Sequence, residues 1–506
     1  MSDHPTFGLF KTLQEKTLDA ERQEIVDKRH SKGYRTAREN LHDLCDAESF
    51  QEYGQLAVAA QRERRELEDL QKNTPADGVI TGTATINQTL LPAADCRAAV
   101  IINDYTVLAG SQGFFHHQKL DRILEVAHQQ QLPVVMYTEG GGGRPGDVDV
   151  KTQIAGLNVN SFIHWGRLHG IAPRIAINNG FCFAGNAALL GGADIAIATR
   201  SSCIGMAGPA MIEGGGLGSF APTDIGPAQQ LATNGTIDLL ADDEAHATAL
   251  AKQVLSYLQG EVAQASCAEQ HLLREAMPEN RRLSYKVRQV LQTIFDTDTV
   301  LELKHAYGKP VITSFARING RAVGVMASNS RELGGAIDAE AADKMADFME
   351  LCDRFGLPIV SLCDTPGFMV GPDSENQAAV PRMSRLFTVG AKLSTPLIAI
   401  FLRKGYGLGA MAMAAGSFAK PVYSASWPTG EFGGMGLEGA VHLGFKKELA
   451  GAASAQERDA LFDSLVDAAY QRGQATEAAA FLEIDAVIDP ADTRAVIIRA
   501  LASTTI

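Results

Sequence analysis

Sequence patterns of several common protein classes are missing from this chain. Only seven of its 506 residues are cysteines, and they are scattered without a Cys-x-x-Cys pair. This argues against a disulfide framework and against a four-cysteine zinc ribbon. His164 and His169 lie five residues apart and lack the HExxH pattern, so we expect no metal site there or elsewhere in the chain.

Positive charge and long apolar runs are also scarce. The chain has 45 lysines and arginines against 59 aspartates and glutamates, which gives a formal net charge of -14. This charge opposes nonspecific binding to nucleic acid or acidic membranes, although a local basic patch can still attract a polyphosphate ligand. No apolar run reaches transmembrane length, and the N-terminal MSDHPTFGLF lacks the apolar stretch of a secretory signal. We therefore expect a cytoplasmic protein.

The composition is otherwise that of a globular protein, with 45% hydrophobic and 21% charged residues. Because 506 residues exceed what one hydrophobic core usually serves, we expect two domains of roughly 200 to 250 residues. An internal repeat supports this division. The first copy has an apolar strand at 98–104, a helix near 117–130 and a strand after Pro133, and the second has the same order at 322–328, near 339–355 and after Pro358. These two prolines lie 225 residues apart, and the next pair, Pro173 and Pro396, lies 223 apart.

Apolar strands that alternate with helices are typical of α/β units with parallel strands. The repeat therefore predicts two α/β domains. Between the two copies lies a polar stretch from about Ala241 to Lys309, which we expect to be helical. We also expect helices in the charged segment 7–73, where the charge run at 61–72 would form a solvated helix face. Both segments are candidates for connectors or oligomer contacts.

In each copy a buried strand runs directly into a glycine-containing turn and then into a helix of small residues. These turns are Phe183–Ala187 and Tyr406–Ala410. The first amides of a helix have no intrahelical acceptor, and the helix dipole adds positive charge there, so such an end suits an anion. If the ligand is a thioester that loses its α-proton, two such amides form an oxyanion hole. Small residues are also favoured where a helix packs closely on a strand, so a structural interpretation stays open for either turn alone.

Other segments carry weaker signals. GGGGRPG at 140–146 brings backbone close to a ligand, but it fits neither a P-loop nor a dinucleotide fingerprint, and a flexible surface loop is equally compatible. His116, His117 and Lys119 can meet a phosphate or donate a proton, or they form the polar start of a helix. Cys182 has no obvious paired base, so we expect a packed small residue there.

Several segments, in this order, match one known family. They are GYRTARENLHDLCDAESFQEYG (33–54), DGVITGTATIN (77–87), GSQGFFHHQK (110–119), the run from Arg281 to Ser328, DTPGFMVG (364–371), RKGYG (403–407) and SWPTGEFGGMGLEGAV (426–441). On these segments the chain resembles, nearly end to end, the carboxyltransferase (β) subunits of biotin-dependent acyl-CoA carboxylases, such as propionyl-CoA and methylcrotonyl-CoA carboxylase.

This resemblance implies two tandem crotonase-like (ClpP/crotonase) ββα-spiral domains. Residues 1–260 of one subunit would bind acyl-CoA, and residues 261–506 of a neighbouring subunit would bind biotin. The site would lie across a dimer interface in a dimer-based hexamer. In such enzymes the carboxyl group passes from carboxybiotin to the α-carbon, or to a vinylogous γ-carbon, of an acyl-CoA, and the biotin anion takes the proton.

The resemblance also implies roles for particular residues. Gly185 and Asn186 would hold the acyl enolate, while Leu408 and Gly409 would hold the ureido oxygen of biotin. The segment expected near the CoA thioester comprises Gly142, Gly143 and Arg144.

The chain departs from the family pattern at several of these positions. The family usually has Gly-Gly where Gly185-Asn186 stands, and a second glycine where Leu408 stands. Met411 takes the place of an acidic residue associated with the choice of acyl chain, and Lys286 replaces an aspartate. The identity of the acyl group therefore stays open.

A separate partner subunit is implied as well. The 506 residues contain no Met-Lys-Met biotinylation site and no ATP-binding carboxylase module, so biotin would be carried on a biotin carboxylase/biotin carrier (alpha) subunit, with acyl-CoA as substrate and no metal. Two alternatives stay open. One is the carboxyltransferase of a biotin-dependent decarboxylase, and the other is a noncatalytic CoA-binding relative, suggested by Asn186 and Leu408.

Overall fold

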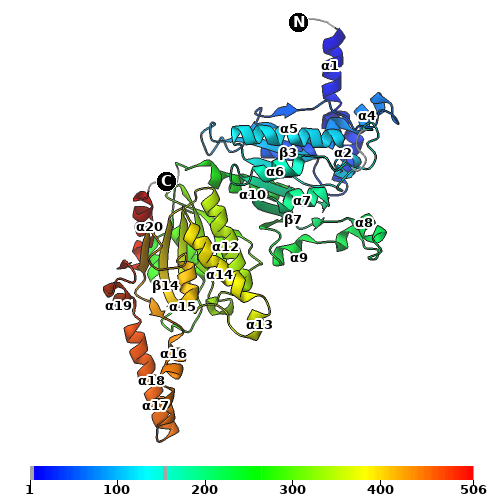
Figure 1. Ribbon diagram of the computed structural model, residues 1–506. Coiled ribbons are helices and arrows are strands. Elements are labelled where there is room, and N and C mark those ends of the chain that lie inside the picture. The colour runs from blue at the N-terminus through cyan, green and yellow to red at the C-terminus, as the bar shows by residue number, and fades with distance from the viewer. Residues whose placement is uncertain (1–4, 152–155, 264, 505–506) are drawn as a thin grey trace. The chain divides into compact units, whose positions relative to one another are not determined.

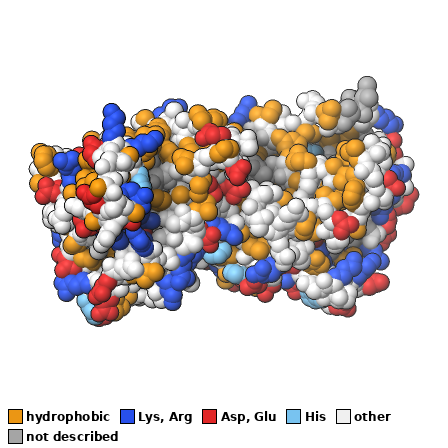
Figure 2. Space-filling model, turned by 90° about the horizontal axis from the view of Figure 1, so that it is seen from below, with side chains coloured by type: hydrophobic (Ala, Val, Ile, Leu, Met, Phe, Trp, Pro, Cys, Tyr) orange, Lys and Arg blue, Asp and Glu red, His pale blue; other side chains and the backbone are white. Residues whose placement is uncertain are grey.

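The computed structural model describes residues 5–151, 156–263 and 265–504. The chain divides into two compact units, Met1–Gly260 and Glu261–Ile506. Each unit contains one large, mostly parallel sheet with helices packed on it (Figure 1). Charged side chains of both signs are interspersed with hydrophobic ones on the face shown in Figure 2. Within the described residues, no helix combines the length and the apolar composition that crossing a bilayer requires.

The first unit has a seven-stranded sheet in the order β1-β2-β3-β4-β5-β7-β9. Its strands are β1 (Gln51–Tyr53), β2 (Val79–Thr85), β3 (Arg97–Asn103), β4 (Val134–Tyr137), β5 (Arg174–Asn178), β7 (Ile195–Thr199) and β9 (Leu239–Ala241). Strands β1 to β3 pair antiparallel, and the remaining pairs are parallel. A second, two-stranded sheet pairs β6 (Phe181–Phe183) with β8 (Cys203–Gly205). The helices are α1 (Pro5–Glu15), α2 (Gln23–His30), α3 (Ala37–Leu44), α4 (Leu67–Asn73), α5 (Phe114–Gln130), α6 (Ser161–Arg167), α7 (Gly185–Gly191), α8 (Pro209–Gly214), α9 (Ala228–Thr233) and α10 (Glu244–Gln259).

The second unit repeats this plan in the order β10-β11-β12-β13-β14-β15-β17, with β16 paired to β14. Its strands are β10 (Leu301–Leu303), β11 (Val311–Ile318), β12 (Arg321–Ser328), β13 (Ile359–Thr365), β14 (Leu397–Tyr406), β15 (Tyr423–Ser426), β16 (Glu431–Gly433) and β17 (Ala486–Val487). Its helices are α11 (Val287–Ile294), α12 (Ala339–Arg354), α13 (Pro372–Glu375), α14 (Ala379–Lys392), α15 (Gly407–Met413), α16 (Leu437–Gly444), α17 (Lys446–Ala450), α18 (Ala455–Arg472), α19 (Ala475–Ala480) and α20 (Thr493–Ala502). Helices α17 and α18 project from this unit (Figure 1, orange).

The two units share close backbone contacts at equivalent positions. Gly110 and Gly335, 225 residues apart, both have positive φ values, of 63° and 86°. A Cβ atom at either glycine would lie 2.5 Å from a strand-end carbonyl oxygen, that of Glu139 or Asp364 respectively. A side chain is thus excluded at the same point of both units.

The repeat also includes a segment whose equivalence only the structure reveals. The salt bridge between Arg38 and Glu52 in the first unit (2.7 Å) has a counterpart between Arg288 and Glu302 in the second (2.7 Å). Both partners are shifted by 250 residues, not 225, because the connections that follow differ in length. Each pair joins a short helix to the first strand of its sheet. The two family-like segments at 33–54 and 281–328 therefore contain the same structural element.

Glu302 makes the stability of the second unit depend on pH. Burial alone would raise its pKa, but hydrogen bonds from His305 and Arg288 outweigh burial and lower the pKa from 4.5 to about 2. The stabilisation is therefore fully present above pH 4.5 and is lost as the pH falls through the folded-state pKa. We expect Glu302→Gln to lower the free energy of unfolding at pH 7 by about 2–3 kcal/mol. Urea unfolding at a series of pH values should show this difference shrinking towards pH 2, while Glu448→Gln, at an exposed position, should show none.

Two expectations about secondary structure were wrong in part. The segment 7–73 is not helical throughout, because it contains β1 and a turn at residues 61–66. The Asp149 carboxylate holds this turn by accepting hydrogen bonds from the backbone N–H groups of Arg62 and Glu63 (2.8 and 3.0 Å). The stretch from Ala241 to Lys309 contains α10 and α11 but also β10, which pairs with the hairpin of the second sheet.

Candidate functional site

The first glycine-containing turn lies where β6 meets α7. Ala184 precedes the helix with φ 52° and ψ -120°, a conformation that residues with a Cβ atom rarely adopt. Its N–H donates to the carbonyl of Gly205 (3.0 Å), and its carbonyl accepts from Ala188 (2.9 Å). The amides of Gly185 and Asn186 are the first two of the helix, so helical geometry gives them no intrahelical acceptor.

The Asn186 side chain ties this turn to the glycine-rich segment 140–146. Asn186 is fully buried. Its Oδ1 atom accepts from the Gly142 N–H at 3.2 Å, and its Nδ2 atom points to the carbonyl of Gly110 at 3.5 Å. Gly140 must remain a glycine because a Cβ there would collide with the backbone carbonyl oxygen of Gly110 as well as with the Asn186 amide. The asparagine that replaces the family's glycine thus links two loops and leaves the backbone amides of the turn in place.

Backbone hydrogen bonds tie the glycine-rich segment 140–146 to neighbouring loops, which argues against the alternative of a flexible surface loop. Gly140 forms two hydrogen bonds with β6, the strand that precedes the turn. The Gly140 N–H donates to the Phe181 carbonyl (2.8 Å), and the Gly140 carbonyl accepts from the Phe183 N–H (2.9 Å). Gln112 donates its N–H to Gly142 (2.7 Å) and accepts from the Arg144 N–H (2.8 Å). These bonds extend strand-like pairing into the loop.

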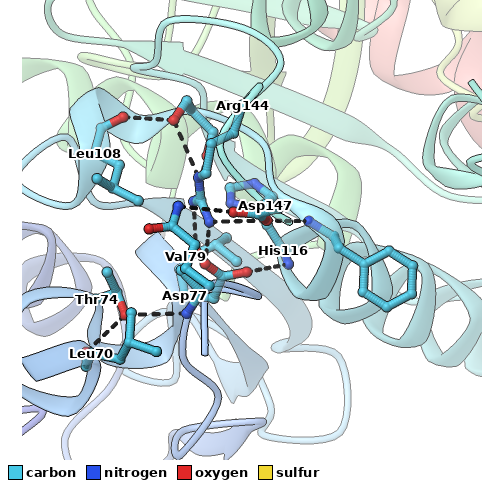
Figure 3. A network of polar contacts seen from close by, with 12 residues as sticks. Leu70, Thr74, Asp77, Val79, Leu108, His116, Arg144 and Asp147 are labelled. Carbon is cyan, nitrogen blue, oxygen red and sulfur yellow. Dashed lines mark hydrogen bonds and ion pairs between the residues drawn. The ribbon is translucent and has the colours of Figure 1, made fainter. Parts of the chain in front are cut away.

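Arg144 lies at the centre of a buried polar network (Figure 3). Its Nη1 atom lies 2.5 Å from Asp77 Oδ1 and 3.5 Å from Asp147 Oδ2, and its Nη2 atom donates to the Ser111 carbonyl at 2.8 Å. The Arg144 side chain is 4% exposed. Two carboxylates therefore already balance its charge, and its contacts position the loop.

The same two carboxylates hold the start of α5. Asp77 Oδ2 accepts from the His116 N–H at 2.7 Å, and Asp147 Oδ2 accepts from the Phe114 N–H at 2.8 Å. Negative charge is stabilised at a helix N-terminus by the free amides and the helix dipole. Arg144 thus joins the glycine-rich loop to α5 through both aspartates.

A cavity of about 540 Å³ opens beside this network, and its wall includes Gln112, His117 and Gly143. The His117 Nδ1 atom lies 2.9 Å from the hydroxyl of Ser161. Burial lowers the pKa of the His117 imidazole, and the nearby Asp121 does not offset this effect. At neutral pH the imidazole is therefore uncharged.

The other two candidate residues of this helix, Lys119 and His116, are not on that wall. Lys119 is buried and donates to the carbonyls of Ala76 (2.9 Å) and Val79. Burial, opposed by the Glu52 charge, lowers the pKa of Lys119 to about 8. His116 is fully buried, and neither ring nitrogen has a hydrogen-bond partner among the described residues. Of the candidates His116, His117 and Lys119, only His117 borders the cavity.

The second glycine-containing turn, between β14 and α15, is closely packed. Gly407 has φ 57°. A Cβ at Gly409 would lie 2.6 Å from the carbonyl carbon of Gly367 and 3.0 Å from the nitrogen of Phe368. Leu408 between them is 57% exposed. The start of α15 thus lies against the DTPG loop, and Leu408, one of the two residues whose backbone amides are candidate donors, is open to solvent.

The DTPG loop is anchored in the same way as the glycine-rich loop of the first unit. Ile337 donates its N–H to Gly367 (3.0 Å) and accepts from the Met369 N–H (2.8 Å). These residues lie 225 positions after Gln112, Gly142 and Arg144. Asp364 lies 225 residues after Glu139, which pairs with Arg29 (3.1 Å), and Asp364 is likewise buried and paired with an arginine, Arg403, at 2.9 Å.

A larger cavity of about 990 Å³ lies beside the second turn. Gly405, Gly407 and Met411 form one part of its wall. The remaining wall is mostly apolar and includes Phe418, Phe432, Leu437, Phe445, Leu465, Ala469, Phe481 and Leu482. Met411 thus faces an apolar cavity, which its own apolar side chain matches.

The structure therefore groups the sequence-derived site residues into two sets. Gly142, Gly143, Arg144, Gly185 and Asn186 gather in the first unit. Leu408, Gly409 and Met411 lie together on α15 of the second. Sequence reasoning missed Asp77, Asp147, Gln112 and the Arg403–Asp364 pair. Asp77 and Gln112 lie inside family-like segments, but only the three-dimensional contacts single them out. Groups of three or more metal-ligating side chains do not occur in the part of the chain that the structure describes.

Comparison with known proteins identifies related sequences and structures. The family described as Carboxyl transferase domain matches residues 28–505. The chain is 34% identical over 490 residues to the methylmalonyl-CoA carboxyltransferase 12S subunit of Propionibacterium freudenreichii subsp. shermanii, with 94% of this chain and 90% of that protein covered. It is 28% identical over 525 residues to the propionyl-CoA carboxylase beta chain of Saccharopolyspora erythraea, covering 98% and 93%.

One similar solved structure is that of a single-chain, multi-domain long-chain acyl-CoA carboxylase. It matches with a TM-score of 0.93 and 51% sequence identity. The match covers 99% of this chain and 49% of the other, so the chain spans about half the length of that protein.

Proposed function

The chain belongs to the carboxyl transferase domain family, and from this membership we infer that it is the carboxyltransferase subunit of a biotin-dependent acyl-CoA carboxylase. Its two units are tandem crotonase-like α/β domains, as the family resemblance predicted. The relative at 51% identity, which is described as a long-chain acyl-CoA carboxylase, supports the carboxylase interpretation.

We assign the two sides of the reaction to the two strand–turn–helix elements. The amides of Gly185 and Asn186 would hold the thioester oxygen of acyl-CoA, and those of Leu408 and Gly409 would hold the ureido oxygen of biotin. The observation that carries this assignment is that both turns pack on equivalent, similarly anchored loops. Two fixed N–H donors stabilise an oxyanion without reorganising during the reaction.

The chain's own residues would supply positioning and charge stabilisation. Carboxybiotin, when bound, would supply the carboxyl group, and the biotin that remains after this group is released would take up the α-proton. The second turn fits such a group because Leu408 leaves it open and Gly409 leaves no side chain between the helix start and the DTPG loop. On the acyl side, negative charge grows on the thioester oxygen as the α-proton leaves. The Arg144 network would keep Gly142 and Gly143 close to that oxygen.

For the acyl group, we propose a long apolar chain. The cavity beside Met411 has about 990 Å³ and a mostly apolar wall, which is at the upper end of the size range of ligand pockets. The proposal is supported by the relative at 51% identity, which is described as a long-chain acyl-CoA carboxylase. The tail of an acyl-CoA bound to one subunit would enter this cavity in the neighbouring subunit.

The proposal predicts how reactivity depends on chain length. With free biotin as acceptor, the chain should decarboxylate malonyl-CoA, methylmalonyl-CoA and a long-chain alkylmalonyl-CoA, with the highest kcat/KM for the last. Ala469→Phe narrows the cavity and should lower kcat/KM for the long-chain substrate by about 10- to 100-fold, since each displaced methylene is worth about 0.8 kcal/mol. The kcat/KM of Ala469→Phe for malonyl-CoA should equal that of the wild type.

Ala460→Phe is the matched control, because Ala460 is exposed on the same helix, α18. Absence of turnover with every substrate, together with no binding to a biotinylated carrier, would refute the carboxyltransferase assignment. Equal effects of Ala469→Phe on all three substrates would refute the acyl assignment of the cavity alone.

We further propose the assembly that the family resemblance implies. A separate subunit would carry biotin and the ATP-using carboxylase, the chain would form dimer-based hexamers, and the complex would work in the cytoplasm. A transcarboxylase 12S protein whose solved structure is described as a hexamer assembly matches this chain at 30% identity with a TM-score of 0.85. This similarity supports the proposed oligomeric state.

A further inference from the structure

Gln112 has a buried side-chain donor that the fold does not use. The residue is 4% exposed and contributes to the wall of the 540 Å³ cavity. Its Nε2 atom has no hydrogen-bond partner among the described residues. A buried polar group without a partner costs about 1–3 kcal/mol, so its presence calls for a physical reason.

The backbone at this position is held rigidly. Gln112 makes the two strand-like hydrogen bonds to Gly142 and Arg144, and the preceding carbonyl, of Ser111, accepts from the Arg144 guanidinium. The network around Arg144, Asp77 and Asp147 (Figure 3) holds that guanidinium in place. The direction in which the Gln112 side chain leaves the backbone is therefore fixed.

That side chain lies against the first glycine-containing turn. A Cβ atom at Gly185 would collide with Gln112 Oε1 and would lie 3.2 Å from Gln112 Cδ. The carboxamide thus covers the α-carbon of the residue whose amide we assign to the thioester oxygen. Rotating the carboxamide by a half-turn exchanges its oxygen and nitrogen with little change in shape, and this presents the N–H donors at the turn.

The second unit shows that the fold does not need an amide here. Ile337 occupies the equivalent position, makes the same two backbone hydrogen bonds and is fully buried. An apolar side chain therefore satisfies this position structurally. The polar residue appears only in the unit to which we assign acyl-CoA.

We propose that Gln112 is a substrate-binding residue whose Nε2 donates a hydrogen bond to the thioester oxygen of acyl-CoA. This rests on the proposed function. When carboxybiotin is bound, its N–C bond would break and release carbon dioxide, and the biotin nitrogen would take the α-proton. The α-carbon would then form the new carbon–carbon bond to that carbon dioxide, while the thioester oxygen carries the transient negative charge. Gln112 exchanges no proton. Its hydrogen bond strengthens as that charge develops and so adds a third donor to the two backbone amides.

The test uses Gln112→Ile, the residue that the fold already accommodates in the second unit. With free biotin and malonyl-CoA, we expect kcat to fall by about 10- to 100-fold, the loss of one donor to a developing oxyanion. Affinity for CoA itself, which lacks the thioester, should be unchanged, and the melting temperature should not decrease. Gln118→Ile, at an exposed position of helix α5, which begins two residues after Gln112, should match the wild type, and Gln112→Glu should be impaired like Gln112→Ile.

Three outcomes of the activity measurements would overturn the proposal, and one outcome of a binding measurement would do so independently. The first is a kcat for Gln112→Ile equal to that of Gln118→Ile. The second is a loss of activity that comes with an equal loss of CoA affinity and a lower melting temperature, which would indicate a structural role. The third is full activity of Gln112→Glu. The binding measurement compares the affinities of wild type and Gln112→Ile for acetyl-CoA, and equal affinities would refute the contact directly. Failure of the proposed function is a separate observation, because the wild type itself would then show no turnover.

Discussion

Gly409→Val should abolish carboxyl transfer while acyl-CoA binding persists. The first side-chain atom at this position would meet the Gly367 carbonyl carbon at 2.6 Å and the Phe368 nitrogen at 3.0 Å. Both are backbone atoms, so they cannot rotate away, and either α15 or the DTPG loop must move. Because an oxyanion hole depends on fixed donors, we expect a loss of kcat of at least about 10²- to 10³-fold. The measurement is decarboxylation of malonyl-CoA with free biotin, with CoA affinity measured in parallel.

The matched control is Gly444→Val. Gly444 also belongs to a helix of the second unit, and a Cβ there meets nothing within 4 Å. Overpacking at Gly409 costs about 1–3 kcal/mol, and a comparison of melting temperatures separates that cost from the loss of activity. If Gly409→Val lowers CoA affinity and leaves biotin binding intact, the two units must exchange their assigned ligands.

The duplicated sheets could be predicted from the sequence because buried parallel strands leave a direct signal. Apolar runs followed by glycine-rich turns recur at a fixed spacing, and each corresponds to an observed strand and turn. The helix limits near 117–130 and 339–355 also agree closely with α5 and α12. In contrast, the Arg38–Glu52 and Arg288–Glu302 pairs were not recognised as equivalents, because their spacing of 250 breaks the 225-residue register.

The roles of individual polar residues were harder to predict because they depend on partners far along the chain. Arg144 follows a run of glycines, a context that suggests contact with a ligand, yet its charge is balanced by Asp77, 67 residues earlier. In the sequence, Asn186 is a departure from the family's Gly-Gly pattern in the oxyanion turn, but in the structure its side chain accepts a hydrogen bond from the Gly142 amide. Neither contact follows from residue type or spacing, since both require that two loops meet at the end of the same sheet.

Arg144→Met should destabilise the first unit strongly. The substitution keeps most of the side-chain volume but leaves Asp77, fully buried, and Asp147, 6% exposed at its side chain, without their cation. Removing one partner of a buried ion pair typically costs about 3–5 kcal/mol, because the remaining charge is not compensated. For a unit of this size, that corresponds to a decrease in melting temperature of about 6–20 °C. Urea unfolding and calorimetry of the full chain would measure it.

Arg200→Met provides the comparison within the same unit. Arg200 forms a 2.8 Å pair with Asp242, but the two side chains are 53% and 65% exposed, and exposed pairs contribute only about 0–1 kcal/mol. Adding Asp77→Asn to Arg144→Met should restore part of the lost stability, because the asparagine oxygen still accepts from the His116 N–H while the unpaired charge is gone. Equal stabilities of Arg144→Met and Arg200→Met would contradict a charge-balancing role for Arg144 and would leave its guanidinium available to a phosphate of CoA.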